Sequence, residues 1–119
     1  MSTRPNSTTR IFAVGDIAVN RDEPDSIFEL VSAQMKQADL AFGQIEAIYS
    51  TLGEVNVSGT SSPLRGDPEN VAAIGRAGFN IASFASNHCM DYGISAFKDT
   101  IAHFRANRIH LLVPATTWP

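Results

Sequence analysis

Cysteine is nearly absent from this sequence, and long apolar runs are missing altogether. Cys89 is the single cysteine among 119 residues, so an internal disulfide is excluded. No uninterrupted apolar run approaches the roughly 20 residues of a membrane-spanning helix, and residues 1–10 lack the apolar core of a secretory signal. The sequence therefore predicts no membrane span and a cytoplasmic location, and it leaves association with the cell envelope open.

Positive charge is also scarce. The chain has 9 Lys and Arg residues against 12 Asp and Glu, a net charge of −3, whereas a nucleic-acid-binding domain usually carries a basic surface. We therefore expect no nucleic-acid partner. Apolar residues make up 44% of the chain, which is ordinary for one soluble domain of this length. Residues 1–9 are predicted to be a disordered leader, residues 10–113 a domain and residues 114–119 an irregular tail.

Three apolar runs typical of buried strands each lead into polar residues that can bind a metal ion. Residues 11–14 lead into Asp16, residues 39–45 into Glu46, and residues 79–85 into Asn87 and His88. Ligands of open α/β sheets bind beyond the carboxyl ends of the strands. If the three strands are parallel neighbours, these side chains converge, and the sequence predicts a metal site there.

Helical patterns separate the apolar runs. Ser26 and Glu29 form a capping-box pattern. The apolar stripe expected to face the core in the helix that follows consists of Ile27, Leu30, Val31 and Met35. Asp67, Pro68 and Gly78 are typical of the N-cap, the first residue and the C-terminal cap of a second helix.

The remaining segments complete a regular alternation. A third helix is expected over residues 95–107 and a fourth strand over residues 109–113. Residues 49–66 favour a long surface loop or a weak hairpin. The order β-α-β-α-β-α-β predicts an α/β fold with a mainly parallel sheet and flanking helices.

Asp16, Glu46 and Arg21 each have a functional and an ordinary interpretation. Asp16 follows a glycine and is either a carboxylate ligand of a metal or a turn residue. Glu46 is either a ligand or a solvated residue at the end of a strand. Arg21 has the planar fork that binds phosphate or carboxylate, but a solvated loop arginine fits the sequence equally well.

Asn87 and His88 form the sharpest pair. Together they can supply one oxygen ligand and one imidazole within a single turn, or they only shape that turn. Asp91 lies close enough in sequence to accept an imidazole N–H from His88 and fix its tautomer. Cys89 has no activating neighbour in the sequence, so we interpret it as a small structural residue.

These segments resemble a known family. The motifs that carry the resemblance are Val14-Gly15-Asp16-Ile17 with Arg21, Ala38-Asp39 leading to Gln44-Ile45-Glu46, and Ala77-Gly78-Phe79-Asn80 leading to Asn87-His88-Cys89-Met90-Asp91-Tyr92-Gly93. Over about residues 11–109 the chain resembles the CapA-type capsule synthesis family of poly-γ-glutamate production, which is similar to the calcineurin-like metallophosphatases. The resemblance implies the N-terminal half of a metallophosphatase-like α/β sandwich.

The resemblance also implies roles for individual residues. Asp16, Glu46 and Asn87 would be metal ligands, with Glu46 as a bridge between two ions. His88, with Asp91, would be catalytic and act on the substrate or its leaving group. The ions implied are Mn, Mg, Zn or Fe, and the substrate would be an anionic small molecule or polymer, with Arg21 among the residues that bind it.

Two departures from the family pattern shape the functional hypothesis. Gln44 stands where the family usually has Asn, and the family's second half, with its His-x-His pattern, is not in this sequence. We therefore expect a truncated member with an incomplete metal site and little or no turnover. The alternative is a non-catalytic remnant or interaction module. In either case an exposed apolar face or an unpaired edge of the sheet predicts self-association.

Overall fold

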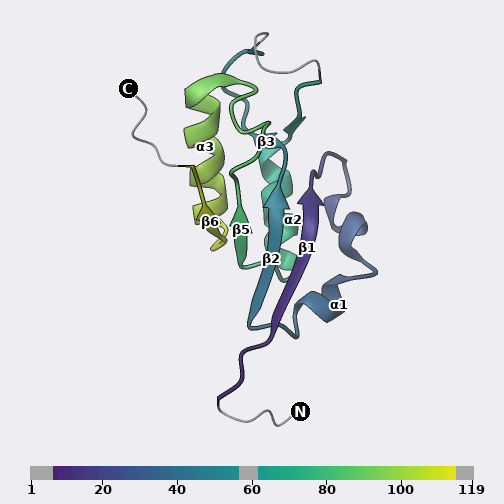
Figure 1. Cartoon of the computed structure of the whole chain (residues 1–119). Helices are drawn as coiled ribbons and strands as arrows, with labels where there is room; N and C mark the ends of the chain where they lie inside the picture. Colours follow the sequence, from purple (N-terminus) through teal and green to yellow (C-terminus); the bar gives the residue numbers. More distant parts are fainter. Residues whose placement is uncertain (1–6, 57–61, 115–119) are drawn as a thin grey trace.

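The core of the protein is a four-stranded sheet in which every neighbouring pair of strands is parallel (Figure 1). The computed structural model describes residues 7–56 and 62–114. The strands follow the order β1-β2-β5-β6, with bounds Ile11–Ile17, Leu40–Ile45, Ile81–Ser83 and His110–Leu112. The predicted α/β fold with a mainly parallel sheet is therefore confirmed.

Helical segments connect the strands along the chain. They are η1 (Pro24–Phe28), α1 (Ser32–Met35), η2 (Pro68–Asn70), α2 (Val71–Arg76) and α3 (Gly93–Ala106). Each new strand along the chain lies on the same side of the previous one in the sheet. Right-handed crossovers between such strands place all connecting helices on one face of the sheet. In Figure 1, α2 lies behind β2, and no helix of the described chain lies in front of β2 or β5. The sheet therefore has one covered and one open face.

The burial pattern of the strands agrees with this one-sided arrangement. Along β2, Ala41 and Ile45 are buried, whereas the alternate residues Phe42 and Gln44 are only half-buried. Ile11 on β1 and Leu112 on β6 are 60% and 48% exposed. The open face is thus rich in apolar side chains, which is unusual for a surface in contact with water.

The hydrophobic core lies between the covered face and the helices α2 and α3. Phe84, just after β5, stacks on Phe97 of α3 with ring centroids 5.4 Å apart. Tyr49 meets Phe104 edge to face at 5.6 Å. Tyr49 also donates its backbone N–H to the Thr100 hydroxyl at 3.0 Å, which ties the chain after β2 to the same helix. These aromatic contacts fix α3 against the sheet.

The prediction for the first helix is wrong. In place of one amphipathic helix, the chain forms the short 3₁₀ segment η1 and a single turn, α1. Leu30 is 93% exposed, and Ile27 and Val31 are also exposed, so three of the four stripe residues do not face the core. Phe28 is the buried anchor, and its ring lies 5.7 Å from that of Phe79. Burial of this larger aromatic surface decides the orientation of the segment.

The end signals of the second helix are confirmed. The Asp67 carboxylate accepts a hydrogen bond from the Glu69 backbone N–H at 2.9 Å, and Pro68 begins η2. Gly78 has φ of 107°, a backbone conformation that side-chain-bearing residues rarely adopt. The chain therefore reverses direction at Gly78, as the sequence predicts.

Residues 49–66 contain a short strand pair. β3 (Ile48–Tyr49) pairs with β4 (Arg65–Gly66) in parallel, which rules out the hairpin and agrees with the other alternative, a long connection. Residues 57–61 of this segment, residues 1–6 of the predicted leader and residues 115–119 of the predicted tail lie outside the described residues. Within the described ranges, no helix is long and apolar enough to cross a membrane.

Candidate functional site

Asp16 and Glu46 come from adjacent strands at the carboxyl end of the sheet. Asp16 lies inside β1, which runs on to Ile17 rather than ending before the aspartate as expected. The β1–β2 register shifts between Ala13 and Asp16, so Asp16 pairs with Gln44. Glu46 follows β2 directly and donates its backbone N–H to the Ile17 carbonyl at 3.0 Å. Parallel pairing therefore brings both acidic residues to one place.

The carboxyl groups of Asp16 and Glu46 lie close enough for Asp16 to affect the ionisation of Glu46. Burial is the main cause that raises the pKa of Glu46. The charge of Asp16 and side-chain hydrogen bonding to Asp16 raise the pKa of Glu46 further. The nearby His88 ring acts in the opposite direction. Two neighbouring carboxyl groups disfavour double ionisation unless a proton or a cation lies between them. The pair is thus a place where a positive charge would be stabilised.

His88 lies against this pair and is oriented by Asp91. Its Nδ1 is 2.7 Å from Asp91 Oδ2, and its Nε2 is 3.9 Å from Glu46 Oε2. An ionised carboxylate only accepts hydrogen bonds, so it holds the proton of a neutral imidazole on Nδ1. Nε2 is then the ring nitrogen that faces Glu46. The predicted contact between Asp91 and His88 is confirmed.

Asp91 also has a structural function. It is 3% exposed, and the oxygen that contacts His88 accepts a second hydrogen bond from the Leu64 backbone N–H at 2.8 Å. The Asp91 carbonyl accepts from the Asn56 N–H at 2.7 Å. Asp91 therefore joins both sides of the long connection to the turn that contains His88.

The other predicted site residues lie apart from these contacts. Asn87 is exposed on the turn before His88. Arg21 donates from Nη1 to the Ser26 hydroxyl at 3.0 Å and lines a separate cavity. Cys89 is half-buried, and burial raises the pKa of its thiol, which fits its interpretation as a structural residue. The structure thus brings together Asp16, Glu46, His88 and Asp91.

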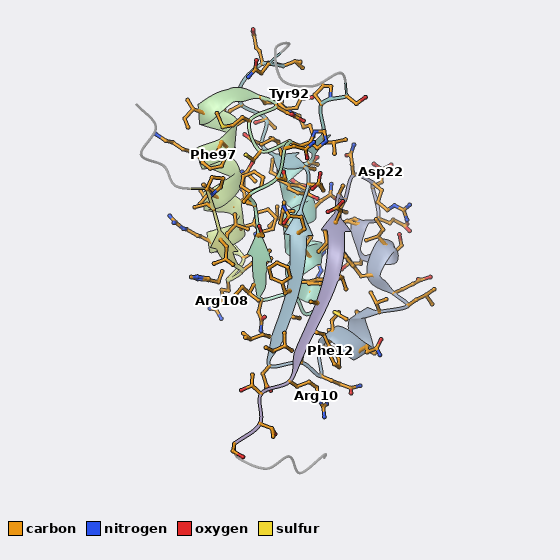
Figure 2. All side chains as sticks on the ribbon, in the orientation of Figure 1. Arg10, Phe12, Asp22, Tyr92, Phe97 and Arg108 are labelled. Carbon is orange, nitrogen blue, oxygen red and sulfur yellow. The ribbon has the colours of Figure 1, made fainter. Side chains whose placement is uncertain are left out.

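Figure 2 locates this end of the molecule. Asp22 marks the loop beyond β1, and Tyr92 marks the turn before α3, while Arg10 lies toward the opposite end of the sheet. The Arg65 guanidinium lies 3.6 Å from the centre of the Tyr92 ring and donates to the Leu52 carbonyl at 2.6 Å. Sequence reasoning missed this cation–π contact, because nothing in the residues near Arg65 indicates a partner that lies far along the chain.

The donor set fits a divalent cation only in part. Carboxylate oxygens suit Mn²⁺ or Mg²⁺, and an imidazole nitrogen also suits Zn²⁺ or Fe. An imidazole whose other nitrogen is held by a carboxylate is a common arrangement at metal centres. Within residues 7–56 and 62–114, however, no three His, Cys, Asp or Glu side chains are arranged to hold one ion. The site is therefore a carboxyl pair with an oriented histidine beside it.

A parallel α/β sheet with carboxyl groups and an oriented imidazole at the carboxyl ends of its strands defines the class of domain. The sequence model of the family described as "Bacterial capsule synthesis protein PGA_cap" matches residues 10–112. The chain belongs to this family, and the resemblance seen in its motifs is confirmed.

Two curated relatives from Bacillus are similar to the chain. "Capsule biosynthesis protein CapA" of Bacillus anthracis is 31% identical over 112 residues, which cover 86% of this chain and 27% of the relative. "PGA biosynthesis protein CapA" of Bacillus subtilis (strain 168) is 26% identical over 107 residues, which cover 83% of this chain and 28% of the relative. The chain thus spans little more than a quarter of each relative's length.

Proposed function

We propose that this chain takes part in capsule synthesis and supplies part of a divalent-cation centre of metallophosphatase type. The support for a role in capsule synthesis is its family and the names of its two relatives. The support for a cation centre is that β1–β2 pairing brings the Asp16 and Glu46 carboxyl groups close to each other. Asp16, Glu46 and the exposed amide of Asn87 would hold one or two ions.

His88 has the position of a proton donor in this proposal. Its Nε2 lies on the side of the carboxyl pair, and Asp91 holds the ring from the other side. A protonated His88 beside this pair can give its proton to a leaving group bound there. A bound divalent ion would supply an activated water and stabilise charge on an ester or phosphate. The substrate class proposed is an anionic small molecule or polymer.

The experiment is a calorimetric titration of the purified chain with Mn²⁺. We expect binding by the unaltered chain and its loss in Asp16→Asn, which keeps the size of the side chain but removes its charge. Glu29→Gln is the matched control, because Glu29 is an exposed acidic residue at the end of η1. Equal binding by the Asp16→Asn variant and the control would exclude Asp16 as a ligand.

The second candidate is a non-catalytic interaction module in which the same residues only shape the turn. The double hydrogen bond at Asp91 Oδ2 favours it, because this contact would be needed for folding alone. This candidate predicts that the unaltered, folded chain binds no Mn²⁺. It also predicts that Asp91→Asn lowers stability by about 1–3 kcal/mol, the cost of disturbing a buried hydrogen bond.

A further inference from the structure

A second polar cavity, of about 460 Å³, lies between the loop after β1 and the segment that begins with η2. It is lined by Arg21 and Asp22 on one side and by Glu69 and Asn70 on the other, and Arg76 also contributes to the wall. None of these residues belongs to the group of Asp16, Glu46, His88 and Asp91. The volume is in the range of small-molecule sites.

The Asn70 side chain in this wall has no hydrogen-bond partner among residues 7–56 and 62–114. Asn70 is only 4% exposed, and its backbone N–H donates to the Asp67 carbonyl at 2.9 Å. Its side-chain amide forms no hydrogen bond with any part of the chain that the structure describes. Arg65 Nε is the one fully buried side-chain polar atom without a partner among the described residues, so the Asn70 amide is accessible from the cavity. The amide therefore offers one acceptor and two donors to a molecule in the cavity.

The charges of the wall are held apart instead of forming ion pairs with each other. Arg76 is neutralised by Asp25, with two contacts of 2.9 and 2.8 Å. The Arg21 guanidinium is held by the neutral Ser26 hydroxyl, and among the described residues it forms no ion pair with a carboxylate. Asp22 and Glu69 line the same cavity. Asp67 lines it as well, so among the described residues one arginine outside any ion pair and three carboxylates share the cavity.

We propose that this cavity binds a small zwitterion that carries one carboxylate and one ammonium group. The fork of Arg21 would bind the carboxylate through two parallel hydrogen bonds. Asp22 and Glu69 would accept from the ammonium group, and the Asn70 amide would bind a remaining polar atom. A ligand with a single charge would satisfy one half of this wall and face repulsion from the other. A neutral polyol would leave both kinds of charge unpaired.

The test uses side-chain amide NMR signals of the purified, ¹⁵N-labelled chain. Glycine, β-alanine and 4-aminobutyrate are the probes, because they separate the two charges by increasing lengths. Acetate and methylammonium carry each charge alone. We expect one zwitterion to shift the Asn70 amide signal in a saturable manner, with much weaker effects of the single-charge probes. The absence of a shift with all three zwitterions, or equal binding of acetate, methylammonium or glycerol, overturns the proposal.

Matched variants locate the bound charges. Arg21→Gln and Asp22→Asn should each weaken zwitterion binding by roughly tenfold to a hundredfold, the loss expected for a hydrogen bond to a charged group. Arg105→Gln, at an exposed position of α3, should bind like the unaltered chain. The Asp16→Asn variant should no longer bind Mn²⁺ but should still bind the zwitterion. The zwitterion site and the proposed cation centre are therefore tested separately. Unchanged binding in Arg21→Gln overturns the assignment.

Discussion

Individual residues at the candidate site owe their positions to partners that are close in space rather than in sequence. The contact of His88 with Asp91 spans three residues and could be predicted from the sequence. The contact of Glu46 with Asp16 depends on parallel pairing of β1 with β2, and it could be predicted only on the assumption that these strands are neighbours. The second hydrogen bond to Asp91, from Leu64, could not be predicted, because no sequence pattern links the two residues.

Tyr49 is the residue for which the structure predicts a pH dependence of stability. Its side chain is fully buried, and its hydroxyl oxygen accepts a hydrogen bond from the Val19 N–H at 2.7 Å. Burial raises the pKa of Tyr49 to about 12. In an unfolded chain the pKa is about 10. Between about pH 10 and pH 12, Tyr49 loses its hydroxyl proton in the unfolded chain but keeps it in the folded chain. The contribution of Tyr49 to stability is therefore complete below about pH 10 and is lost as the pH rises to about 12.

The variant Tyr49→Phe tests this dependence in urea unfolding at increasing pH. At neutral pH we expect it to be less stable by about 1–3 kcal/mol, because the Val19 N–H loses its partner. Above about pH 10 the difference should shrink, because the phenylalanine has no proton to lose. Tyr92→Phe serves as the control. A difference between the unaltered chain and Tyr49→Phe that stays constant across this range would contradict the assignment.

At the scale of elements, local signals were reliable where the backbone itself sets the conformation. The Asp67-Pro68 start and the Gly78 end were correctly predicted, because a cap and a positive φ depend on a few adjacent residues. The first helix was wrongly predicted, because its orientation depends on the contact of Phe28 with Phe79, which is distant in sequence. Tertiary packing overrides periodicity in such a short segment.

Gly78 gives a prediction at this scale. Gly78→Ala should lower the free energy of unfolding by about 1–2 kcal/mol or more, because alanine resists a positive φ. An added Cβ would also lie 3.0 Å from the Lys36 backbone N. Gly15→Ala is the matched control, because Gly15 has no positive φ and its added Cβ would meet nothing within 4 Å. Chemical denaturation of both variants measures the difference, and equal stabilities would refute the argument.

At the scale of the whole molecule, the main feature is the uncovered face of the sheet. The strands are added in one direction, so their helices lie on one side and leave apolar residues such as Ile11, Leu40 and Leu112 exposed on the other. The sequence predicted association through an exposed apolar face or an unpaired edge of the sheet. The structure shows an apolar surface on the face of the sheet.

We therefore predict concentration-dependent self-association of the purified chain. The double variant Leu40→Lys, Leu112→Lys should reduce it, because burying two ammonium groups between apolar faces is unfavourable. Leu30→Lys is the control, since Leu30 is exposed but lies between η1 and α1, away from the sheet strands. Sedimentation velocity measures the outcome. A monomer at all concentrations, or equal effects of the two changes, would contradict a role of this face.

The sequence by itself determined the alternation of strands and helices, the caps of the second helix and the pairing of His88 with Asp91, because these depend on patterns among neighbouring residues. Only the tertiary structure decided that Asp16 and Glu46 lie close together, that Asn70 and Arg21 share a cavity, and which residues form the open face of the sheet. The physical reason is that strand order and helix placement bring distant segments together, and no local pattern records which segments become neighbours.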